Sequence, residues 1–346
     1  MNQVDVIIVG QGIAGTLLAH ELEERHLTIA IIDKPLPASA SRVAAGIINP
    51  VGMKRCIPSY NASVFLPFAF ERYRALEKKL GDSFFHPMPI FRLFANEDVR
   101  HEWQIKYSNT AMHRYIEAIM QENTFHLLND SYGSAKVSPA AYLEVNKWLA
   151  ISRSYFKKHH LLVEEQFDYS LIDVNCPSYK GIQARYIIFC EGFRVINNPF
   201  FSHLPLSPTK GEVMRIKLCS HENLEGIVSK GVYVLPVGNG EYLVGSTYDH
   251  NDLTDTLTDQ AKHQLTEQLE GILSVDFEIL DRKAGVRPTV KHRKPLFGLH
   301  KNYSQIGVFN GLGTRGLLQG PHLSTQFSDN IINRTKTHIY LKNKTL

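Results

Sequence analysis

The sequence predicts an α/β protein that combines a parallel sheet with an antiparallel one. Residues 4–9 and 27–33 are short, continuous apolar runs rich in β-branched residues, typical of strands buried on both faces. Residues 16–26 between them have leucines at helical spacing. Residues 231–247 read as two strands around a Gly-Asn-Gly turn, which indicates an antiparallel hairpin. The chain therefore opens with a β-α-β unit and carries antiparallel structure later.

Length and composition place the chain among ordinary globular proteins. It has 346 residues, 43% hydrophobic and 21% charged, enough for about two domains. A net charge of +4 is not that of a dedicated nucleic-acid binder. Neither the four scattered cysteines nor the histidines have metal-ligand spacing, so we expect reduced thiols and no metal site. Without a signal-peptide pattern or an apolar run of ~18 residues, we expect a cytoplasmic protein without a membrane span.

The first strand ends in a glycine run with the spacing G-x-G-x-x-G. Gly10 permits a tight turn, Gly12 lets backbone amides approach a pyrophosphate, and Gly15 lets the helix pack closely on the strand. The helix N-terminus favours phosphate, and Asp33 at the end of the second strand is placed to bind a ribose diol. The β-α-β context predicts a dinucleotide site. The alternative is a closely packed helix and strand without ligand, and Asp33 does not separate NAD from FAD.

The segment that follows the second strand is rich in small residues. Residues 39–46 contain serines, alanines and a glycine, which suit a backbone lying against a flat ligand. Ser41 and Arg42 are placed to reach phosphate or ring oxygens. The alternative is a flexible connector, although Ile47 and Ile48 favour packing.

The rest of the chain divides into further helices and strands. A helix is expected over 61–80, with Asn61 and Ser63 as candidate N-caps and Gly81 as its stop. Further helices are expected at 97–109, 111–123, 138–160 and 257–273, and strands at 89–96, 161–167, 167–175 and 179–190.

Six segments in the same order resemble the D-amino-acid-oxidase and glycine-oxidase family of FAD-dependent oxidoreductases. They are SRVAAGIINP (41–50), ARYIIFCEGF (184–193), PTKGEVM (208–214), GVYVLPVGNGEYLVGST (231–247), AGVRPTVKHRKPLFGLH (284–300) and NGLGTRGLLQGP (310–321). The resemblance covers almost the whole chain. It implies a Rossmann-like FAD-binding domain of the glutathione-reductase type, interleaved with a mixed or antiparallel-sheet substrate domain. We expect the FAD-binding domain in 1–85, 135–207 and 285–346, and the substrate domain in 86–134 and 208–284.

The glycine runs and the resemblance together predict the residues that contact a non-covalently bound FAD. They are Gly10, Gly12, Ile13, Ala14, Gly15, Asp33, Lys34, Ser41, Arg42, Ala44, Ala45, Gly46, Ile48, Phe167, Cys190, Glu191, Gly192, Gly311, Leu312, Gly313, Thr314, Gly316 and Leu317. Cys190 is expected to be a core residue rather than a redox-active thiol.

The resemblance also implies three substrate residues. Arg287 in Gly-x-Arg-Pro is the expected carboxylate clamp, because a guanidinium binds a carboxylate with two parallel hydrogen bonds. Tyr233 would donate its hydroxyl to the same carboxylate, and Arg315 would lie near substrate and flavin. The alternatives are a structural ion pair for Arg287, hairpin packing for Tyr233 and a solvated surface position for Arg315.

The implied activity is oxidation of the Cα–N bond of glycine, sarcosine or a D-amino acid to an imine, by hydride transfer to flavin. The alternatives are oxidation of a 2-hydroxy acid, oxidation of a carboxymethylaminomethyl group on tRNA, and a flavoprotein without turnover. A small-molecule substrate is expected, with O2 or another electron acceptor, and the oligomeric state stays open. His292 stands where the family usually has an acid, and the basic cluster Lys291–Lys294 is either a solvated turn or a surface for a phosphorylated or nucleic-acid substrate.

A second run with the same spacing, Gly311, Gly313 and Gly316, lies near the end of the chain. It follows a strand-like stretch and opens a helix, but no further strand or acidic residue follows it, so it fails the dinucleotide test. We expect this turn to direct a helix N-terminus at the flavin ring, where it would stabilise negative charge. The two runs would then hold opposite ends of one FAD.

Overall fold

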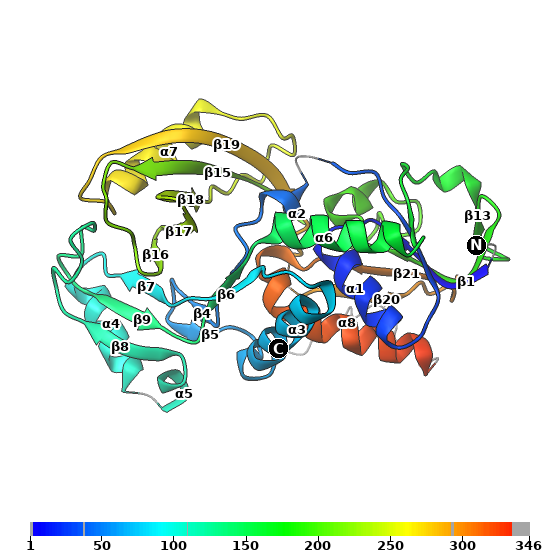
Figure 1. Ribbon diagram of the computed structural model, residues 1–346, viewed down its shortest axis with the longest axis horizontal. Coiled ribbons are helices and arrows are strands. Elements are labelled where there is room, and N and C mark those ends of the chain that lie inside the picture. The colour runs from blue at the N-terminus through cyan, green and yellow to red at the C-terminus, as the bar shows by residue number, and fades with distance from the viewer. Residues whose placement is uncertain (1–2, 37–38, 109, 292–293, 334–346) are drawn as a thin grey trace.

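The structure is a computed structural model that describes residues 3–36, 39–108, 110–291 and 294–333. It is elongated, with a helix-covered sheet in one lobe and a second sheet in the other (Figure 1). The predicted mixed α/β class is confirmed by this arrangement.

The first lobe is built on a largely parallel eight-stranded sheet. Its main path runs β11-β2-β1-β14-β13-β12, and β21 joins β14 and β20. The bounds are β1 Gln3–Val9, β2 Ile29–Ile32, β11 Leu162–Val163, β12 Ile172–Asp173, β13 Ser178–Tyr179, β14 Ile182–Phe189, β20 Leu296–Leu299 and β21 Ile306–Asn310. Strands β2, β1, β14 and β21 are parallel neighbours, so their carboxyl ends meet at one edge of the sheet, where α/β proteins bind ligands.

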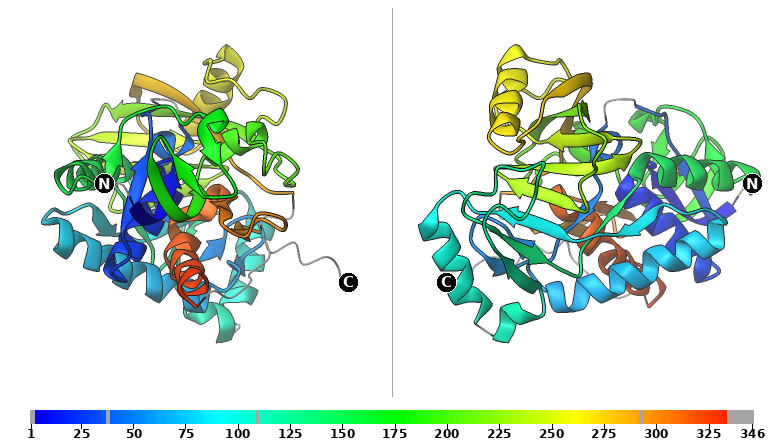
Figure 2. Two further views of the ribbon diagram at one scale, coloured as in Figure 1. Left: turned by 90° about the vertical axis from the view of Figure 1, so that its right-hand side faces the viewer. Right: turned by 60° about the vertical axis from the view of Figure 1, so that its left-hand side comes forward.

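Four helices accompany this sheet. They are α1 Ile13–Glu24, α3 Ala62–Leu80, α6 Val145–Lys158 and α8 Gly316–Ile332. Helix α8 packs on α1 and α3 (Figure 2), and the Tyr73 hydroxyl on α3 donates to the carbonyl of Leu317 on α8 at 3.0 Å. The predicted 61–80 helix is confirmed, including its end at Gly81, whose φ of +72° suits glycine. Helix α8, the last helix among the described residues, is therefore packed against α1, the first.

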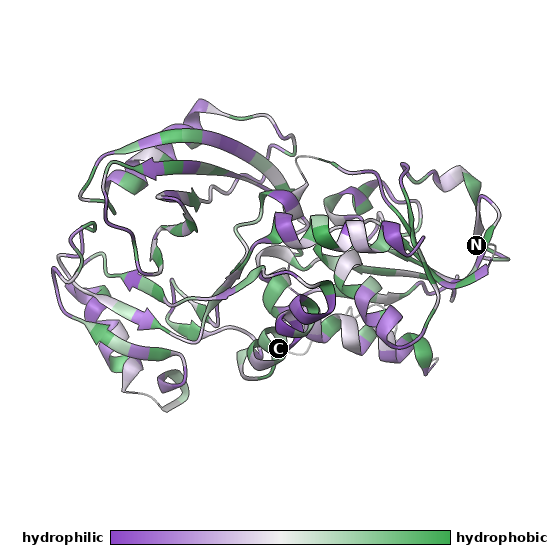
Figure 3. Ribbon diagram, viewed as in Figure 1, coloured by the Kyte–Doolittle hydropathy of each residue, from purple (hydrophilic) through white to green (hydrophobic). Residues whose placement is uncertain are grey.

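The second lobe holds an eight-stranded, mostly antiparallel sheet in the order β19-β15-β18-β17-β16-β7-β9-β8. Its strands are β7 Ile90–Leu93, β8 Ile116–Met120, β9 Ser134–Val137, β15 Thr209–Leu218, β16 Ile227–Lys230, β17 Val232–Gly238, β18 Glu241–Gly245 and β19 Phe277–Arg287. Helices α4 Glu97–Tyr107, α5 Thr110–His113 and α7 Asp259–Glu270 accompany it. Exposure alternates over residues 277–280 of β19 and residues 284–286 are buried, and Figure 3 shows hydrophilic and hydrophobic bands along this strand. Strands β17 and β18 form the predicted hairpin.

Shorter elements complete the fold. They are α2 Ala40–Val43, the small sheet of β3 Ile47–Ile48, β10 Ala141–Leu143 and β6 Phe85–Pro87, the pair β4 Val51–Gly52 and β5 Ile57–Pro58, and the 3-10 turns Tyr169–Leu171, Gly192–Asn197 and Gly313–Arg315.

Two predicted helices are wrong in part. Residues 138–160 do not form one helix, because Ala141–Leu143 pairs with β3 and β6 and the helix begins only at Val145. Residues 111–123 give one short helical turn and then β8, which pairs with β9 at the edge of the second sheet. In both cases a partner strand from elsewhere in the chain overrides the local helical pattern.

The domain division stays a prediction, and sheet membership supports two adjustments. Strand β9 reaches Val137 and pairs in the second sheet, although the expected FAD-binding domain includes residues 135–207. Strand β19 likewise stays in the second sheet as far as Arg287, past the expected boundary at 285.

Candidate active site

One long cavity of about 610 Å³ runs from the carboxyl edge of the parallel sheet to the antiparallel sheet. This volume is within the range of roughly 300–1,000 Å³ that ligand sites usually have. The wall includes residues of the first glycine turn, the 39–49 segment, the end of β14, the second glycine turn and strands β15 to β19. Every segment that the motifs singled out therefore reaches the same cavity.

The first glycine turn is built by close backbone packing. Gly10 has a φ of +102°, and a Cβ there would lie 2.7 Å from the carbonyl oxygen of Cys190 on the neighbouring strand. A Cβ at Gly15 would lie 1.9 Å from the carbonyl oxygen of Gly10. Both positions require glycine, because these nearest neighbours are backbone atoms that cannot move aside without shifting the strand or the turn. The predicted close packing of α1 on β1 through Gly15 is thereby confirmed.

The N-terminus of α1 opens toward the cavity. Gly12 is its N-cap residue, and the first turn contains no acidic residue that would repel an anion. The Ser41 hydroxyl accepts a hydrogen bond from the Ile13 amide at 3.1 Å, and a Cβ at Gly12 would lie 2.9 Å from this oxygen. Ser41 thus fixes the α2 segment to the helix and keeps its hydroxyl proton for another acceptor.

Asp33 lies at the end of β2, where its carboxylate has two partners. One oxygen accepts from the Gln11 amide at 2.9 Å, and the other from Nη1 of Arg153 at 2.7 Å. Arg153 comes from α6, and it also bonds the Gln11 side-chain oxygen at 2.8 Å and Glu164 at 2.9 Å. Arg153 is not among the predicted site residues, because nothing in the sequence shows that α6 packs beside the first β-α-β unit.

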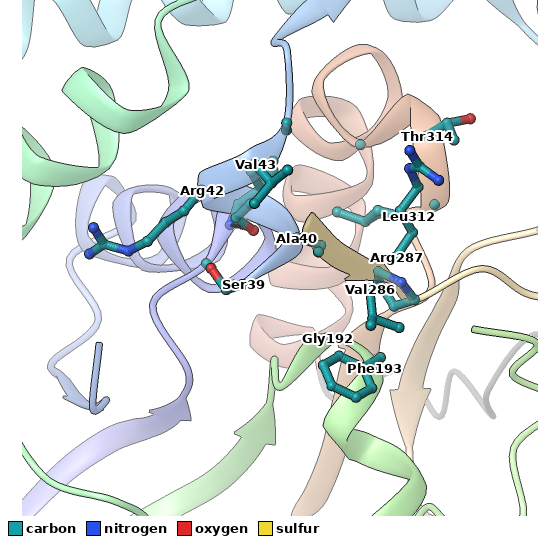
Figure 4. A pocket seen from close by; sticks show the side chains of 18 of the residues that line it. Ser39, Ala40, Arg42, Val43, Gly192, Phe193, Val286, Arg287, Leu312 and Thr314 are labelled. Carbon is teal, nitrogen blue, oxygen red and sulfur yellow. Dashed lines mark hydrogen bonds between the residues drawn. The ribbon is translucent and has the colours of Figure 1, made fainter. Parts of the chain in front are cut away.

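The small residues after β2 line the cavity as expected. Gly46 has a φ of +83°, and a Cβ there would lie 2.0 Å from the carbonyl oxygen of Leu143, so the segment lies flat on β10. Ala44 and Ala45 are on the cavity wall beside it. The Arg42 side chain also belongs to the wall, but it points away from Leu312 and Val286 (Figure 4).

The end of β14 contributes a buried carboxyl group. Glu191 accepts hydrogen bonds from the Tyr169 hydroxyl and from the Asn198 amide at 2.7 Å. Burial raises the pKa of Glu191 above its usual value. Its neighbour Cys190 is buried, and burial raises the pKa of that thiol too, which fits the expected core role rather than a reactive thiolate.

The second glycine turn follows β21 and leads into α8. Gly311 and Gly313 have φ values of +69° and +55°. The Asn310 amide donates to the carbonyl oxygen of Gly192 at 2.7 Å, which joins this turn to the end of β14. The first turn of α8 contains no acidic residue. Its N-terminus therefore presents free amides and a partial positive charge near the cavity wall.

Arg315 lies in this turn and reaches back to the segment after β3. Its Nη1 donates to the Asn49 carbonyl at 3.1 Å and to the Ser59 hydroxyl. The alternative of a solvated surface arginine does not describe this position, because the side chain is partly buried and borders the cavity.

Arg287 closes the opposite end of the cavity. Its guanidinium donates to the Ser246 hydroxyl at 2.7 Å and, at 3.4 Å, to the Thr247 carbonyl. It also lies under the Tyr248 ring, with 4.7 Å between Cζ and the ring centroid. None of the described acidic residues is within ion-pair distance of Arg287. A Cβ at Gly211 would lie 1.9 Å from Nη2, so glycine at this position makes room for the guanidinium.

Tyr233 stands on β17 beside Arg287. Its hydroxyl lies where a Cβ at Gly245 would be only 2.8 Å away, so the facing glycine makes room for it. Burial raises the pKa of Tyr233, and the charge of Arg287 opposes this effect. The phenol therefore stays protonated and able to donate a hydrogen bond.

Most of the predicted contact residues border the cavity, and three do not. Gly15 packs on Gly10, Ile48 is buried in the core, and Gly311 packs on Val290 and Leu296. The wall residues that are absent from the predicted set include Asn49, Gly211, Ser246, Tyr248, Leu253, Asp255 and Asn310.

Other predictions concern the surface and metals. His292 and Arg293 of the basic cluster are outside the described residues, while Lys291 and Lys294 are exposed. Among the described residues, no helix has the length and apolar content that crossing a bilayer requires. The same part of the chain holds no group of three or more histidine, cysteine, aspartate or glutamate residues placed to bind a metal ion.

The parallel sheet, the glycine turn at its carboxyl edge and the long cavity define a dinucleotide-binding protein of mixed α/β fold. A family model described as "FAD dependent oxidoreductase" matches residues 5–328. The chain therefore belongs to this family of FAD-dependent oxidoreductases and uses FAD as its cofactor. The resemblance stated from the motifs is confirmed.

Relatives and solved structures support the same family. A glycine oxidase of Pseudomonas aeruginosa is 23% identical, with 91% of each chain covered. A "tRNA 5-methylaminomethyl-2-thiouridine biosynthesis bifunctional protein" of Marinobacter nauticus is 20% identical over 94% of this chain and 55% of its own length. The crystal structure of glycine oxidase from Geobacillus kaustophilus covers 100% of both chains, with a TM-score of 0.81 and 19% identity. An iminodiacetate oxidase from Chelativorans gives a TM-score of 0.79 at 18% identity, with 97% of each chain covered.

The residues present fit FAD. Gly10 and Gly12 leave the cavity floor free of side chains, and the N-terminus of α1 offers amides without a nearby acid. Asp33 stands at the end of β2, where the diol of an adenosine ribose lies in this fold. The cavity continues from this end to Arg287 and Tyr233, which leaves the far end for a substrate.

Proposed function

We propose that the protein oxidises the Cα–N bond of a small amine or amino acid of the glycine, sarcosine or D-amino-acid type. The observation that carries this proposal is Arg287, a partly buried guanidinium at the cavity end without an acidic partner among the described residues. A buried cation without a counter-ion is costly, so an anionic ligand is expected to complete the site.

Arg287 is placed to bind a carboxylate and to hold it in one orientation. Its hydrogen bonds to Ser246 and Thr247, with the Tyr248 ring on one face, limit the directions in which the guanidinium can turn. A planar fork held in this way accepts a carboxylate through two parallel hydrogen bonds. The carboxylate then fixes which face of the substrate's Cα is directed along the cavity.

Tyr233 would add a second donor to the same carboxylate. Since burial raises the pKa of this phenol, it carries its proton at neutral pH. The pair of Arg287 and Tyr233 therefore recognises the anion and excludes water from it.

FAD, when bound, supplies the acceptor for the hydride that leaves Cα with its two electrons. As this C–H bond breaks, the Cα–N bond becomes a double bond and the amine loses one proton. Water then hydrolyses the imine to an oxo acid and releases the nitrogen as ammonia, or as a primary amine when the nitrogen carries a substituent. The chain contributes positioning, and the N-terminus of α8 would stabilise negative charge that develops on the bound flavin.

A screen for flavin reduction under anaerobic conditions tests this proposal. We expect bleaching of the flavin absorbance with glycine, sarcosine or a D-amino acid. Bleaching by 2-hydroxy acids alone would reassign the reaction to an alcohol oxidation. Bleaching only by RNA carrying carboxymethylaminomethyluridine would reassign the substrate to tRNA. Readmitting air to the reduced protein would show whether O2 is the electron acceptor.

The Arg287→Ala variant tests the clamp itself. We expect kcat/KM to fall at least 100-fold, about 2.7 kcal/mol of binding, while the FAD content stays equal to that of the wild type. Arg215→Ala removes an exposed arginine from β15 and is the matched control, with unchanged kinetics expected. An Arg287→Ala protein that reduces its flavin at the wild-type rate would overturn the assignment.

A further inference from the structure

Residues 246–258, which we call the mouth loop, join β18 to α7 beside Arg287. Four of these residues, Ser246, Tyr248, Leu253 and Asp255, border the cavity. Tyr248 is 63% exposed and Leu253 37%, so this stretch forms the rim rather than the floor. The loop has no strand or helix of its own, and its position must come from contacts outside it.

Those contacts converge on Lys210 of β15. Its side chain is only 2% exposed, and its ammonium donates to the Asp252 carboxylate and to the Thr256 carbonyl. Its backbone pairs with Asp249, through N···O distances of 2.8 and 3.0 Å. One buried residue therefore holds the loop at its start, middle and end.

The charges around Lys210 show that the pairing is ionic. The hydrogen bond from Lys210 lowers the pKa of Asp252 to about 2, so this carboxylate is ionised at neutral pH. Glu212, two residues along β15, is also 2% exposed and accepts from the Thr258 amide at 3.0 Å and hydroxyl at 2.8 Å. The Lys210 ammonium lies 3.9 Å from the Glu212 carboxylate and therefore interacts with two carboxylates, those of Asp252 and Glu212.

The same residue touches the substrate end directly. The Lys210 carbonyl accepts a hydrogen bond from Arg287 at 3.5 Å, at the outer limit of such a contact. Tyr248, three residues into the loop, covers the guanidinium. Lys210 and Arg287 therefore belong to one connected network of contacts.

We propose that Lys210 is a positioning residue whose ion pair with Asp252 holds the mouth loop against the cavity, so that Tyr248 and Leu253 set the size of substrate that reaches Arg287. This inference rests on the proposed carboxylate site at Arg287. It adds a determinant of specificity that contacts neither the substrate nor FAD.

Two variants disrupt the ion pair between Lys210 and Asp252 in different ways. Asp252→Asn removes the charge but retains an oxygen that can accept from the Thr254 amide and hydroxyl, which Asp252 binds at 2.7 Å. Lys210→Met removes the cation from the buried side. The matched controls are Asp259→Asn, an exposed acid on α7, and Lys217→Met, an exposed lysine on β15. Asp252 is partly exposed, so its variant is expected to fold even where Lys210→Met does not.

The loop itself is observed by amide hydrogen exchange. In both variants we expect faster exchange at Asp249, residue 252, Thr254 and Thr258, whose amides are hydrogen-bonded within this network. Exchange in β1 and α1, and the dissociation constant of FAD, should match the wild type. Unchanged exchange in a folded variant would overturn the proposal.

The substrate end is observed by titrating the flavin spectrum with acetate and with phenylacetate. We expect the affinity ratio of phenylacetate to acetate to rise about tenfold in Asp252→Asn, because the rim no longer excludes the bulky acid. An unchanged ratio in a variant with a loosened loop would also overturn the proposal. If acetate fails to bind the wild type, or binds Arg287→Ala equally well, the carboxylate site of the proposed function fails instead.

Discussion

The two ends of the cavity use glycine for different purposes. At the cofactor end, a Cβ at Gly15 would lie 1.9 Å from the backbone oxygen of Gly10. At the substrate end, a Cβ at Gly211 would lie at the same distance, 1.9 Å, from Nη2 of Arg287. The first neighbour is backbone and cannot move, while the second is the end of a flexible side chain. Although the two distances are equal, we expect an added methyl group to disrupt the fold at Gly15 and to weaken substrate binding at Gly211.

The largest effect is expected from Gly15→Ala. The added methyl group forces α1 away from β1, which should cost about 3 kcal/mol in unfolding free energy and remove the phosphate site at the helix N-terminus. We expect protein that purifies without FAD and melts at a lower temperature. Gly271→Ala is the control, because its nearest neighbours are 3.5 Å away. A Gly15→Ala protein with a full complement of FAD would contradict the argument.

Gly211→Ala should weaken binding at the substrate end of the cavity without affecting FAD binding at the other end. The methyl group displaces the guanidinium of Arg287 while the backbone stays in place, so FAD content and melting temperature are expected to match the wild type. The dissociation constant for acetate, measured from the flavin spectrum, should rise at least tenfold, about 1.4 kcal/mol. Loss of FAD from this variant would show that the two ends are not independent.

Arg153→Met tests the charged side chains at the cofactor end. Arg153 holds the Asp33 carboxylate through a 2.7 Å hydrogen bond, and without it Asp33 is free to turn away from the position where we expect the ribose diol. We expect the dissociation constant of FAD to rise about tenfold, measured by flavin fluorescence, with no change in the ratio of kcat values among substrates. Arg185→Met, at an exposed arginine paired with Asp5, is the control. Equal FAD affinity in Arg153→Met would assign Asp33 a purely structural role.

The smallest effect is expected from Glu191→Gln, read from stability against pH. Burial raises the native pKa of Glu191 above the unfolded value of about 4.3. The native state then binds the proton more tightly, so the unfolding free energy falls as pH rises from about 4.3 through the raised native pKa. Below that window the carboxyl group is neutral in both states and has no such cost. Urea unfolding of the apoprotein at pH 5 and pH 8 should show a smaller loss in Glu191→Gln than in the wild type, and an equal loss would contradict this account.

Local patterns predicted the elements whose structure depends on near neighbours in the chain. The first β-α-β unit, the 61–80 helix with its stop at Gly81 and the 231–247 hairpin were all predicted from spacing and turn residues. One predicted helix was wrong at 138–144 because β3 and β6, distant in the sequence, pair with β10. Another was wrong at 111–123 because residues 116–120 pair with the next strand, β9. Periodicity cannot report such partners.

The sequence by itself determined the dinucleotide-binding turn and the glycine turns and strand ends of the six segments, because short-range sterics set these features and leave a readable spacing. The resemblance of those segments to a known family indicated FAD as the cofactor. Only the tertiary structure placed Arg153 beside Asp33 and buried Lys210 under the mouth loop. Those contacts join residues 120 and 42 positions apart, respectively. Charged side chains become partners only when packing brings their elements together, and no local pattern in the chain encodes that proximity.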